Sequence, residues 1–100
     1  MHVLILWGSG DRRVYAVLDR PTIEEKIQAV EVLARVEQQL GRDLSRNVFF
    51  DRTILWIWWE TSQEDRAQVL DVARRVLEGY GFSTEVVGDV DEPATVGASG

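Results

Sequence analysis

The sequence predicts a two-layer α+β sandwich in which two similar strand–turn–strand–helix halves are followed by a last strand. Two short runs, Val3–Trp7 and Ile54–Trp59, are apolar at every position and far too short to span a membrane, which is typical of buried strands. Two longer segments carry apolar residues at helical spacing and end close to a glycine. Shifting the chain against itself by 40 residues aligns these features, for example Gly41 with Gly81.

Five strands are expected where β-branched and aromatic residues are bounded by turn residues. They are Val3–Trp7, Val14–Leu18, Asn47–Phe50, Thr53–Trp59 and Phe82–Val87. The Gly8–Asp11 cluster joins the first two strands as a hairpin. Pro21 stops the second strand, because proline lacks the amide hydrogen that a sheet needs. Asn47–Phe50 is the shortest of the five, so the second hairpin is less clearly marked than the first.

Each predicted helix opens with the pattern Thr-x-x-Glu. In this pattern the threonine oxygen accepts a hydrogen bond from an early helical amide, and the glutamate reaches back to the threonine amide. The first helix is expected over residues 22–40, with Gly41 in the left-handed cap position. The second is expected over residues 61–78 and is closed by Gly79 and Gly81.

The resulting order is ββα(β)βαβ, and it contains a pseudo-repeat of 40 residues because turn, cap, helix and glycine coincide at one offset. This order is compatible with a ferredoxin-like sandwich extended by a hairpin, and also with the ββαβαββ order used in de novo design. Residues 1–88 are expected to form a single α/β domain. Residues 89–100 are expected to be an acidic, flexible C-terminal tail, in which Ala94–Val96 is a candidate for an extra strand.

The apolar residues exceed what a sheet with one covered face needs, because such a sheet alternates apolar and polar residues. The strand that contains Trp56 and Trp58 is apolar on both faces. On the first helix the apolar arc is about 220° wide, and Val32 and Val36 lie on its flank. Three arrangements account for the excess: helices on opposite faces, a second copy on the open face, or a flat apolar ligand. The predicted interface residues are therefore Val32, Val36, Trp56 and Trp58.

No motif for catalysis, for a cofactor or for a metal stands out in the sequence. The chain has no cysteine, which excludes disulfides and thiolate chemistry, and its one histidine is His2. The Gly8–Asp11 cluster lacks the lysine and the hydroxyl residue of a phosphate-binding loop. Asp19, Asp51 and Glu60 fall at predicted strand ends, where carboxylates can bind a divalent cation or exchange protons. Turn formation is the simpler explanation for them.

These observations favour a non-enzymatic protein-interaction or scaffold domain that binds a second copy of itself, as a homodimer, or another protein. The formal net charge of −6 disfavours binding to nucleic acid. No apolar run is long enough to predict a membrane partner. The cysteine-free composition fits a cytoplasmic location if the protein is natural.

Two alternative functions are kept. The first is a de novo designed or engineered fold with no biological function, which the helix caps and glycine stops favour. The irregular loop at residues 42–47 and the three tryptophans within residues 56–59 speak against design. The second alternative is a small enzyme or ligand binder that uses the strand-end carboxylates.

Overall fold

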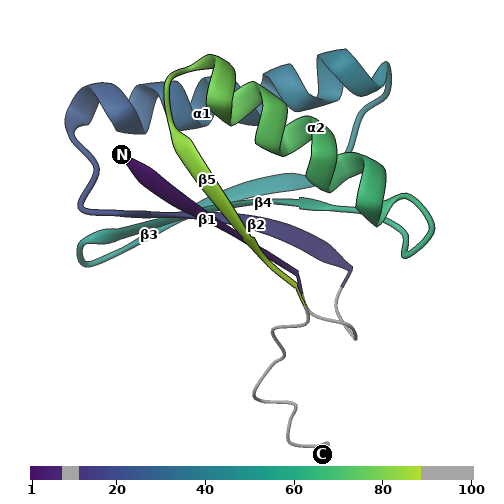
Figure 1. Cartoon of the computed structure of the whole chain (residues 1–100), viewed down its shortest axis with the longest axis horizontal. Coiled ribbons are helices and arrows are strands. Elements are labelled where there is room, and N and C mark those ends of the chain that lie inside the picture. Colours follow the sequence, from purple (N-terminus) through teal and green to yellow (C-terminus); the bar gives the residue numbers. More distant parts are fainter. Residues whose placement is uncertain (8–11, 89–100) are drawn as a thin grey trace, which may run out of the picture.

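The computed structural model describes residues 1–7 and 12–88. In this part of the chain five strands and two helices follow one another in the order ββαββαβ (Figure 1). The elements are β1 (His2–Trp7), β2 (Arg13–Asp19), α1 (Ile23–Leu40), β3 (Arg46–Asp51), β4 (Ile54–Glu60), α2 (Arg66–Gly79) and β5 (Ser83–Val87). The predicted α+β class is confirmed, and the second hairpin is complete. The Gly8–Asp11 cluster, the tail and the Ala94–Val96 strand lie outside the described residues.

The five strands form one mixed sheet in the order β3-β4-β2-β1-β5. Within it β1 and β5 run parallel, and the other three neighbouring pairs are antiparallel. The pairing of β2 with β4 joins the two hairpins, with Ala16 opposite Ile57 near its middle. β2 is the central strand of the five, and β4 is its neighbour. Each of these two strands is followed by a helix in the sequence.

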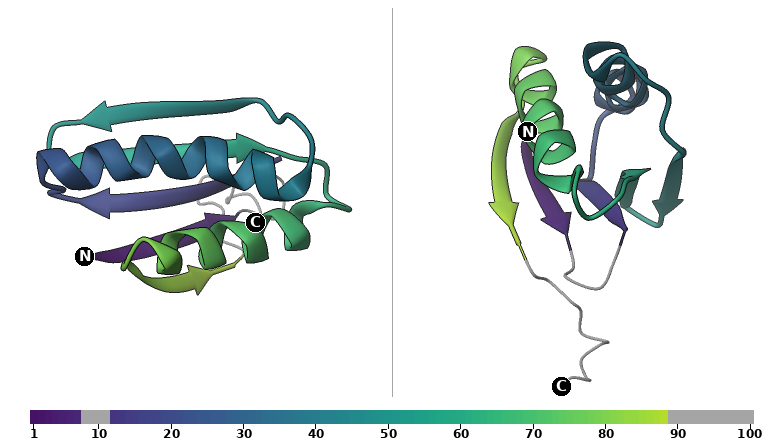
Figure 2. Two further views of the ribbon diagram at one scale, coloured as in Figure 1. Left: turned by 90° about the horizontal axis from the view of Figure 1, so that it is seen from above. Right: turned by 90° about the vertical axis from the view of Figure 1, so that its right-hand side faces the viewer.

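Both helices cover the same face of the sheet, so the fold has two layers (Figure 2). α1 packs mainly on β4, α2 packs on β5 and β2, and the two helices contact each other. The arrangement with helices on opposite faces, one of the three predicted solutions, is therefore wrong. Among the described residues, no helix is long and apolar enough to cross a membrane.

The core lies between the helices and the sheet, and alternate residues of the central strands supply it. On β4 these residues are Leu55, Ile57 and Trp59. Trp59 is the largest fully buried side chain, and its indole N–H donates a hydrogen bond to the Leu33 carbonyl on α1 at 3.1 Å. The bond satisfies the one polar group of an otherwise apolar side chain, as a buried tryptophan requires. It also ties the sheet to the backbone of α1.

Val32 and Val36 of α1 lie in the hydrophobic core, to which both helices and the sheet contribute. Both side chains are completely buried, in the same core cluster as Val72 and Val76 of α2. The structure therefore does not present them to a partner, contrary to the prediction that they are interface residues. The apolar arc of α1 is wide because it serves two neighbours, the sheet and α2.

The first helix has the predicted caps. The Thr22 hydroxyl oxygen accepts a hydrogen bond from the Glu25 amide at 3.1 Å, and the Glu25 carboxylate accepts one from the Thr22 amide at 2.8 Å. Gly41 follows the helix with a φ of 74°, a left-handed conformation in which glycine carries no steric cost.

The second helix begins later than predicted. Thr61 does not cap it, because the Thr61 side chain is buried and its hydroxyl donates to the Ser62 carbonyl. Instead, the Ser62 hydroxyl oxygen accepts a hydrogen bond from the Asp65 amide at 3.2 Å, and the helix starts at Arg66. The Thr-x-x-Glu pattern is thus a cap in the first half only.

We expect Trp59→Phe to lower the free energy of unfolding by about 1–3 kcal/mol, because it removes buried volume and leaves the Leu33 carbonyl without this donor. Urea denaturation of the dilute protein measures the loss. Trp58→Phe is the matched control, since Trp58 is the neighbouring residue but is only half-buried on the opposite face. Equal losses in the two variants would contradict the role given to Trp59.

Candidate functional site

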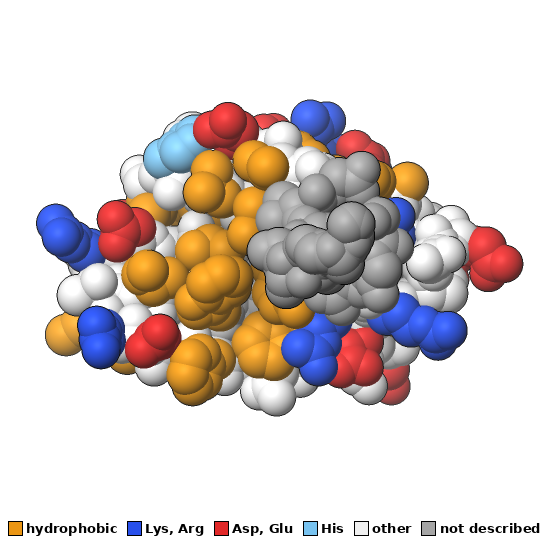
Figure 3. All heavy atoms as spheres, turned by 90° about the horizontal axis from the view of Figure 1, so that it is seen from below, with side chains coloured by type: hydrophobic (Ala, Val, Ile, Leu, Met, Phe, Trp, Pro, Cys, Tyr) orange, Lys and Arg blue, Asp and Glu red, His pale blue; other side chains and the backbone are white. Residues whose placement is uncertain are grey.

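The face of the sheet that neither helix covers is the candidate functional surface. It carries the residues that alternate with the buried ones, and most of them are apolar and half-buried. The apolar members are Leu4, Leu6, Tyr15, Val17, Phe49, Ile54, Trp56, Trp58 and Val87. Figure 3 views this face from below, and hydrophobic side chains gather in the visible part of its middle while charged side chains lie at its margin. We call this whole face of the sheet, with its apolar and its polar residues, the open face.

An aromatic cluster forms the middle of the open face. Tyr15 on β2 lies between Trp56 and Trp58, with ring centroids 5.9 and 5.8 Å away. The first pair is edge-to-face, at 84°, a geometry that aromatic rings prefer. Phe49 on β3 lies opposite Trp56 and keeps 55% of its surface exposed. The structure thus places the predicted interface residues Trp56 and Trp58 together, and adds Tyr15 and Phe49.

Charged side chains border the cluster. The Arg13 guanidinium lies 5.3 Å from the centre of the Trp58 ring and 3.6 Å from the Glu60 carboxylate. Asp19 lies at the other end of β2, on the same face as Arg13 because the two are six positions apart and side chains alternate along a strand. A central strand of the open face therefore has a cation at one end and a carboxylate at the other.

The strand-end carboxylates are not brought together into one site. Asp19 and Asp51 both lie beside Ile54, one on each neighbouring strand, whereas Glu60 is at the far end of β4. In the described part of the chain there is no group of three or more histidine, aspartate or glutamate side chains that could hold a metal ion. The positions thus offer no shared carboxylate centre.

A row of polar side chains crosses the β1–β5 edge of the open face. The two imidazole nitrogens of His2 lie 3.1 Å from the Ser83 hydroxyl and 3.1 Å from the Glu85 carboxylate. The residue types are those of a hydrolase triad, but the His2 and Glu85 side chains are 56% and 60% exposed. Because such chemistry depends on excluding water, we assign this row to the polar border of the open face.

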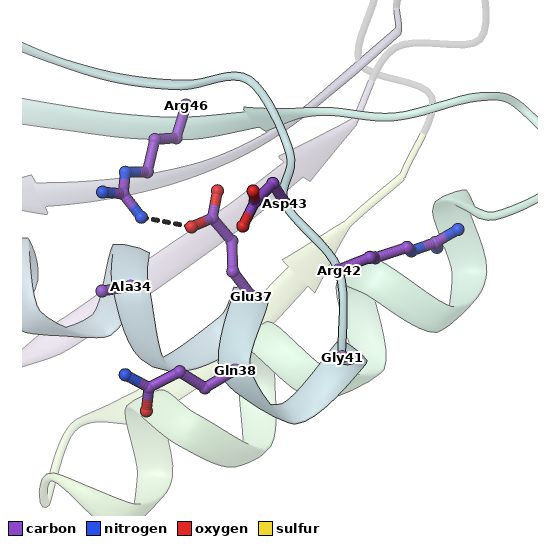
Figure 4. Close-up of a pocket in the computed structure, with 7 residues that line it drawn as sticks. All are labelled: Ala34, Glu37, Gln38, Gly41, Arg42, Asp43 and Arg46. Atoms are coloured by element: carbon purple, nitrogen blue, oxygen red, sulfur yellow. Dashed lines mark hydrogen bonds and ion pairs between the residues drawn. The ribbon is translucent and has the colours of Figure 1, made fainter.

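The helix side has a polar hollow of about 500 Å³ at the end of α1, lined by Glu37, Gln38 and Arg46 among others (Figure 4). The Glu37 side chain is only 11% exposed and bonds the Arg46 guanidinium. It also accepts a hydrogen bond from the Leu44 amide at 3.0 Å. Glu37 therefore fixes the irregular loop between α1 and β3, and its bonds within the chain account for its burial.

Tyr80, directly after α2, connects the two helices. Its hydroxyl donates a hydrogen bond to the Glu31 carboxylate on α1 at 3.0 Å. Burial raises the pKa of the Tyr80 phenol above its ordinary value, the hydrogen bond and the charge of Glu31 raise it further, and the Arg35 charge opposes the rise. The sequence did not predict this contact, because the pair forms only when the helices pack side by side.

Comparisons with known proteins found matches among solved structures only. No protein-family model matches the chain, and no curated protein matches its sequence. SMU.848 from Streptococcus mutans is similar over 87% of this chain and 93% of its own, with 9% identity and a TM-score of 0.43. The essential ribosomal processing protease Prp from S. aureus, in complex with a substrate peptide, covers 87% of this chain and 97% of its own, with 12% identity and a TM-score of 0.40. Similarity this low carries no information on activity.

We expect Glu37→Ala to lower the free energy of unfolding by about 1–3 kcal/mol, because the Leu44 amide and the Arg46 guanidinium both lose their partner. Chemical denaturation measures the change. The matched control is Gln38→Ala, which alters the exposed neighbour in the same hollow and should change the stability by less than about 0.5 kcal/mol. A stable Glu37→Ala variant would show that the loop is fixed by other contacts.

The raised pKa of Tyr80 predicts a loss of stability in alkali. A folded-state pKa above the unfolded one stabilises the fold fully below the ordinary value of 10.0, and the contribution disappears as the pH rises through the raised pKa. We expect Tyr80→Phe to cost less than about 1 kcal/mol at pH 8, with the difference from the parent protein shrinking at pH 11. Urea denaturation at the two pH values tests this. A difference that does not change with pH is the contrary result.

Proposed function

We propose that this chain is a non-enzymatic protein-interaction domain that self-associates by packing its open face against that of a second copy. The observation that carries the proposal is the aromatic centre of a sheet face that neither helix covers. Packing two such faces about 10 Å apart is the ordinary way in which sheets bury apolar residues.

The distribution of charge on β2 supports a second copy as the occupant. Arg13 and Asp19 lie at opposite ends of the same face. When two copies stack with their β2 strands antiparallel, Arg13 of each lies near Asp19 of the other. Because Arg13 already pairs with Glu60, each end of the contact then holds one arginine between carboxylates of the two copies. A two-fold axis in the plane of the sheet produces this arrangement, and a symmetric contact repeats every favourable pair.

The other proposed functions have less support. A designed origin was favoured by caps near the design ideal in both helices, but Asp65 at the start of α2 makes no side-chain capping bond. A carboxylate enzyme needs its acidic groups close together, and Glu60 is at the other end of β4 from Asp51 and Asp19. We keep the pseudo-repeat of 40 residues in the proposal, as a description of two halves that each consist of a hairpin and a helix.

We expect Val17→Lys to dissociate this contact, because Val17 lies next to Trp56 in the middle of the open face and the variant places two ammonium groups in the interface. Sedimentation velocity at tens of micromolar should show a halved mass with unchanged circular dichroism.

The control is Val86→Lys, which alters a strand valine on the helix side of β5, away from the open face. It should leave the mass unchanged. A parent protein that is monomeric at these concentrations, or a Val17→Lys variant with the parental mass, rules out the proposal.

A further inference from the structure

The large apolar side chains that are most exposed gather at one edge of the molecule. Seven are more than a third exposed in the described chain. Six of these belong to β3, an outer strand of the sheet, or to α1: Ile23, Ile27, Val30, Val48, Phe49 and Phe50. The seventh, Val86, is on β5 at the opposite edge. This distribution is independent of the open face, to which only Phe49 belongs.

All of the six except Phe49 lie on the helix side of this edge, in two layers. Ile23, Ile27 and Val30 form one stripe of α1, since residues four and seven positions apart lie on one side of a helix. Val48 and Phe50 point to the helix side of the sheet, because they pair with the buried residues of β4. The Lys26 ammonium lies 4.3 Å from the centre of the Phe50 ring, so this part of α1 stands beside β3.

Beside these side chains, the backbone of β3 has an edge that pairs with no described strand. The Ser45 carbonyl accepts a hydrogen bond from the Glu60 amide at 2.7 Å, so odd-numbered residues of β3 direct their backbone groups toward β4. Arg46, Val48 and Phe50 therefore direct theirs outward. The Val48 amide donates to the side chain of its neighbour Asn47 at 2.8 Å, which fits an amide that faces away from β4.

We propose that the β3 edge is a second interface between copies of this chain, in which two β3 strands pair antiparallel and the two α1 stripes face each other. A two-fold axis perpendicular to the sheet relates the two copies. It joins their sheets into one continuous sheet and places their helices on the same side of it. An added peptide strand would cover β3 but would leave Ile23 and Ile27, which are 75% and 56% exposed, in water. Only a partner with a strand and an apolar helix beside it covers both layers, and the chain itself has this edge.

The exposed apolar area suits a dimer contact. At roughly 150–200 Å² for each large side chain, the five on the helix side expose roughly 400–550 Å², compared with about 800 Å² per partner in a standard interface. This is in the upper part of the range for the largest apolar patch of a typical monomer, about 300–600 Å². Backbone hydrogen bonds between the two β3 strands add the directional part of the contact.

This interface does not depend on the proposed contact of the open faces, and the two are compatible. One axis lies in the plane of the sheet and the other is perpendicular to it. Together they generate a closed tetramer in which two ten-stranded sheets pack face to face with the helices outside. If only one contact forms, the chain is a dimer, and the variants below tell which contact it is.

Two matched valine substitutions test the edge. Val48 and Val86 are 41% and 38% exposed, and both lie on the helix side of an outer strand. We expect Val48→Lys to halve the mass found by sedimentation velocity and to raise the dissociation constant of the edge contact at least about tenfold. Val86→Lys should match the parent protein. Should Val48→Lys fail to fold by circular dichroism, Ile27→Lys takes its place, since that helix side chain is already 56% exposed.

The comparison with Val17→Lys separates the two contacts. A parent tetramer that becomes a dimer with either variant supports both. A mass that Val48→Lys and Ile27→Lys leave unchanged while Val17→Lys halves it overturns the edge interface and leaves the proposed function standing. The reverse pattern supports the edge and overturns the contact of the open faces, and a parent protein that stays monomeric overturns both.

Hydrogen exchange gives a second readout. In the edge dimer, the amides of Arg46 and Phe50 on β3 become paired and should exchange at least about tenfold more slowly than in the Ile27→Lys monomer. Equal exchange rates at these two amides in the parent protein and in the variant would contradict strand pairing.

Discussion

The antiparallel pairing of β2 with β4 determines where the helices lie, and the two surfaces proposed for function follow from it. The chain leaves β2 through α1 and returns on β3, and it leaves β4 through α2 and returns on β5. Both are crossovers between parallel strands, which are right-handed in nearly every known case. The two crossovers start from neighbouring strands that run in opposite directions, and they lead to opposite edges of the sheet. Two right-handed crossovers related in this way place both helices on the same face. The other face receives no helix from the described chain.

This arrangement explains why an apolar surplus remains. β4 is apolar on both sides, and only Leu55, Ile57 and Trp59 meet the helices. Tyr15 reduces the exposure of Trp56 and Trp58 by packing between them. Ring contacts of this kind contribute about 0.5–1.5 kcal/mol each. The three side chains nevertheless remain only half-buried. The cluster is thus ordered before a partner arrives, which lowers the entropy that binding costs.

The sequence alone predicted the bounds of those elements whose signals come from residues nearby in the chain. The capping box of Thr22 and the glycine at position 41 mark α1 within one residue, because both signals act within a few residues of the helix end. The same local pattern failed at Thr61, because that side chain is drawn into the core. Val32 and Val36 were misjudged for a related reason, since the core that buries them is completed by residues of α2, which is distant in sequence. The order of the strands was not predictable, because it depends on pairing between residues far apart in sequence, such as Val17 with Trp56 and His2 with Ser83, and local patterns carry no information on such pairing.

The two edges of the sheet differ in a way that the topology alone does not require. At the β5 edge, α2 packs on the strand, Glu78 accepts a hydrogen bond from Thr84 at 2.7 Å, and His2 and Glu85 place polar groups on the other side. At the β3 edge, α1 sits mainly over β4, and the strand is apolar in its middle and exposed throughout. Long apolar edges invite pairing, and proteins that remain monomeric protect them with charges, prolines or bulges. Here one edge has that protection and the other has an apolar helix stripe beside it. A lack of protection along β3 does not by itself account for the exposed Ile23 and Ile27 on the adjacent helix. A partner that covers both the strand and the helix accounts for the exposed apolar residues of both layers.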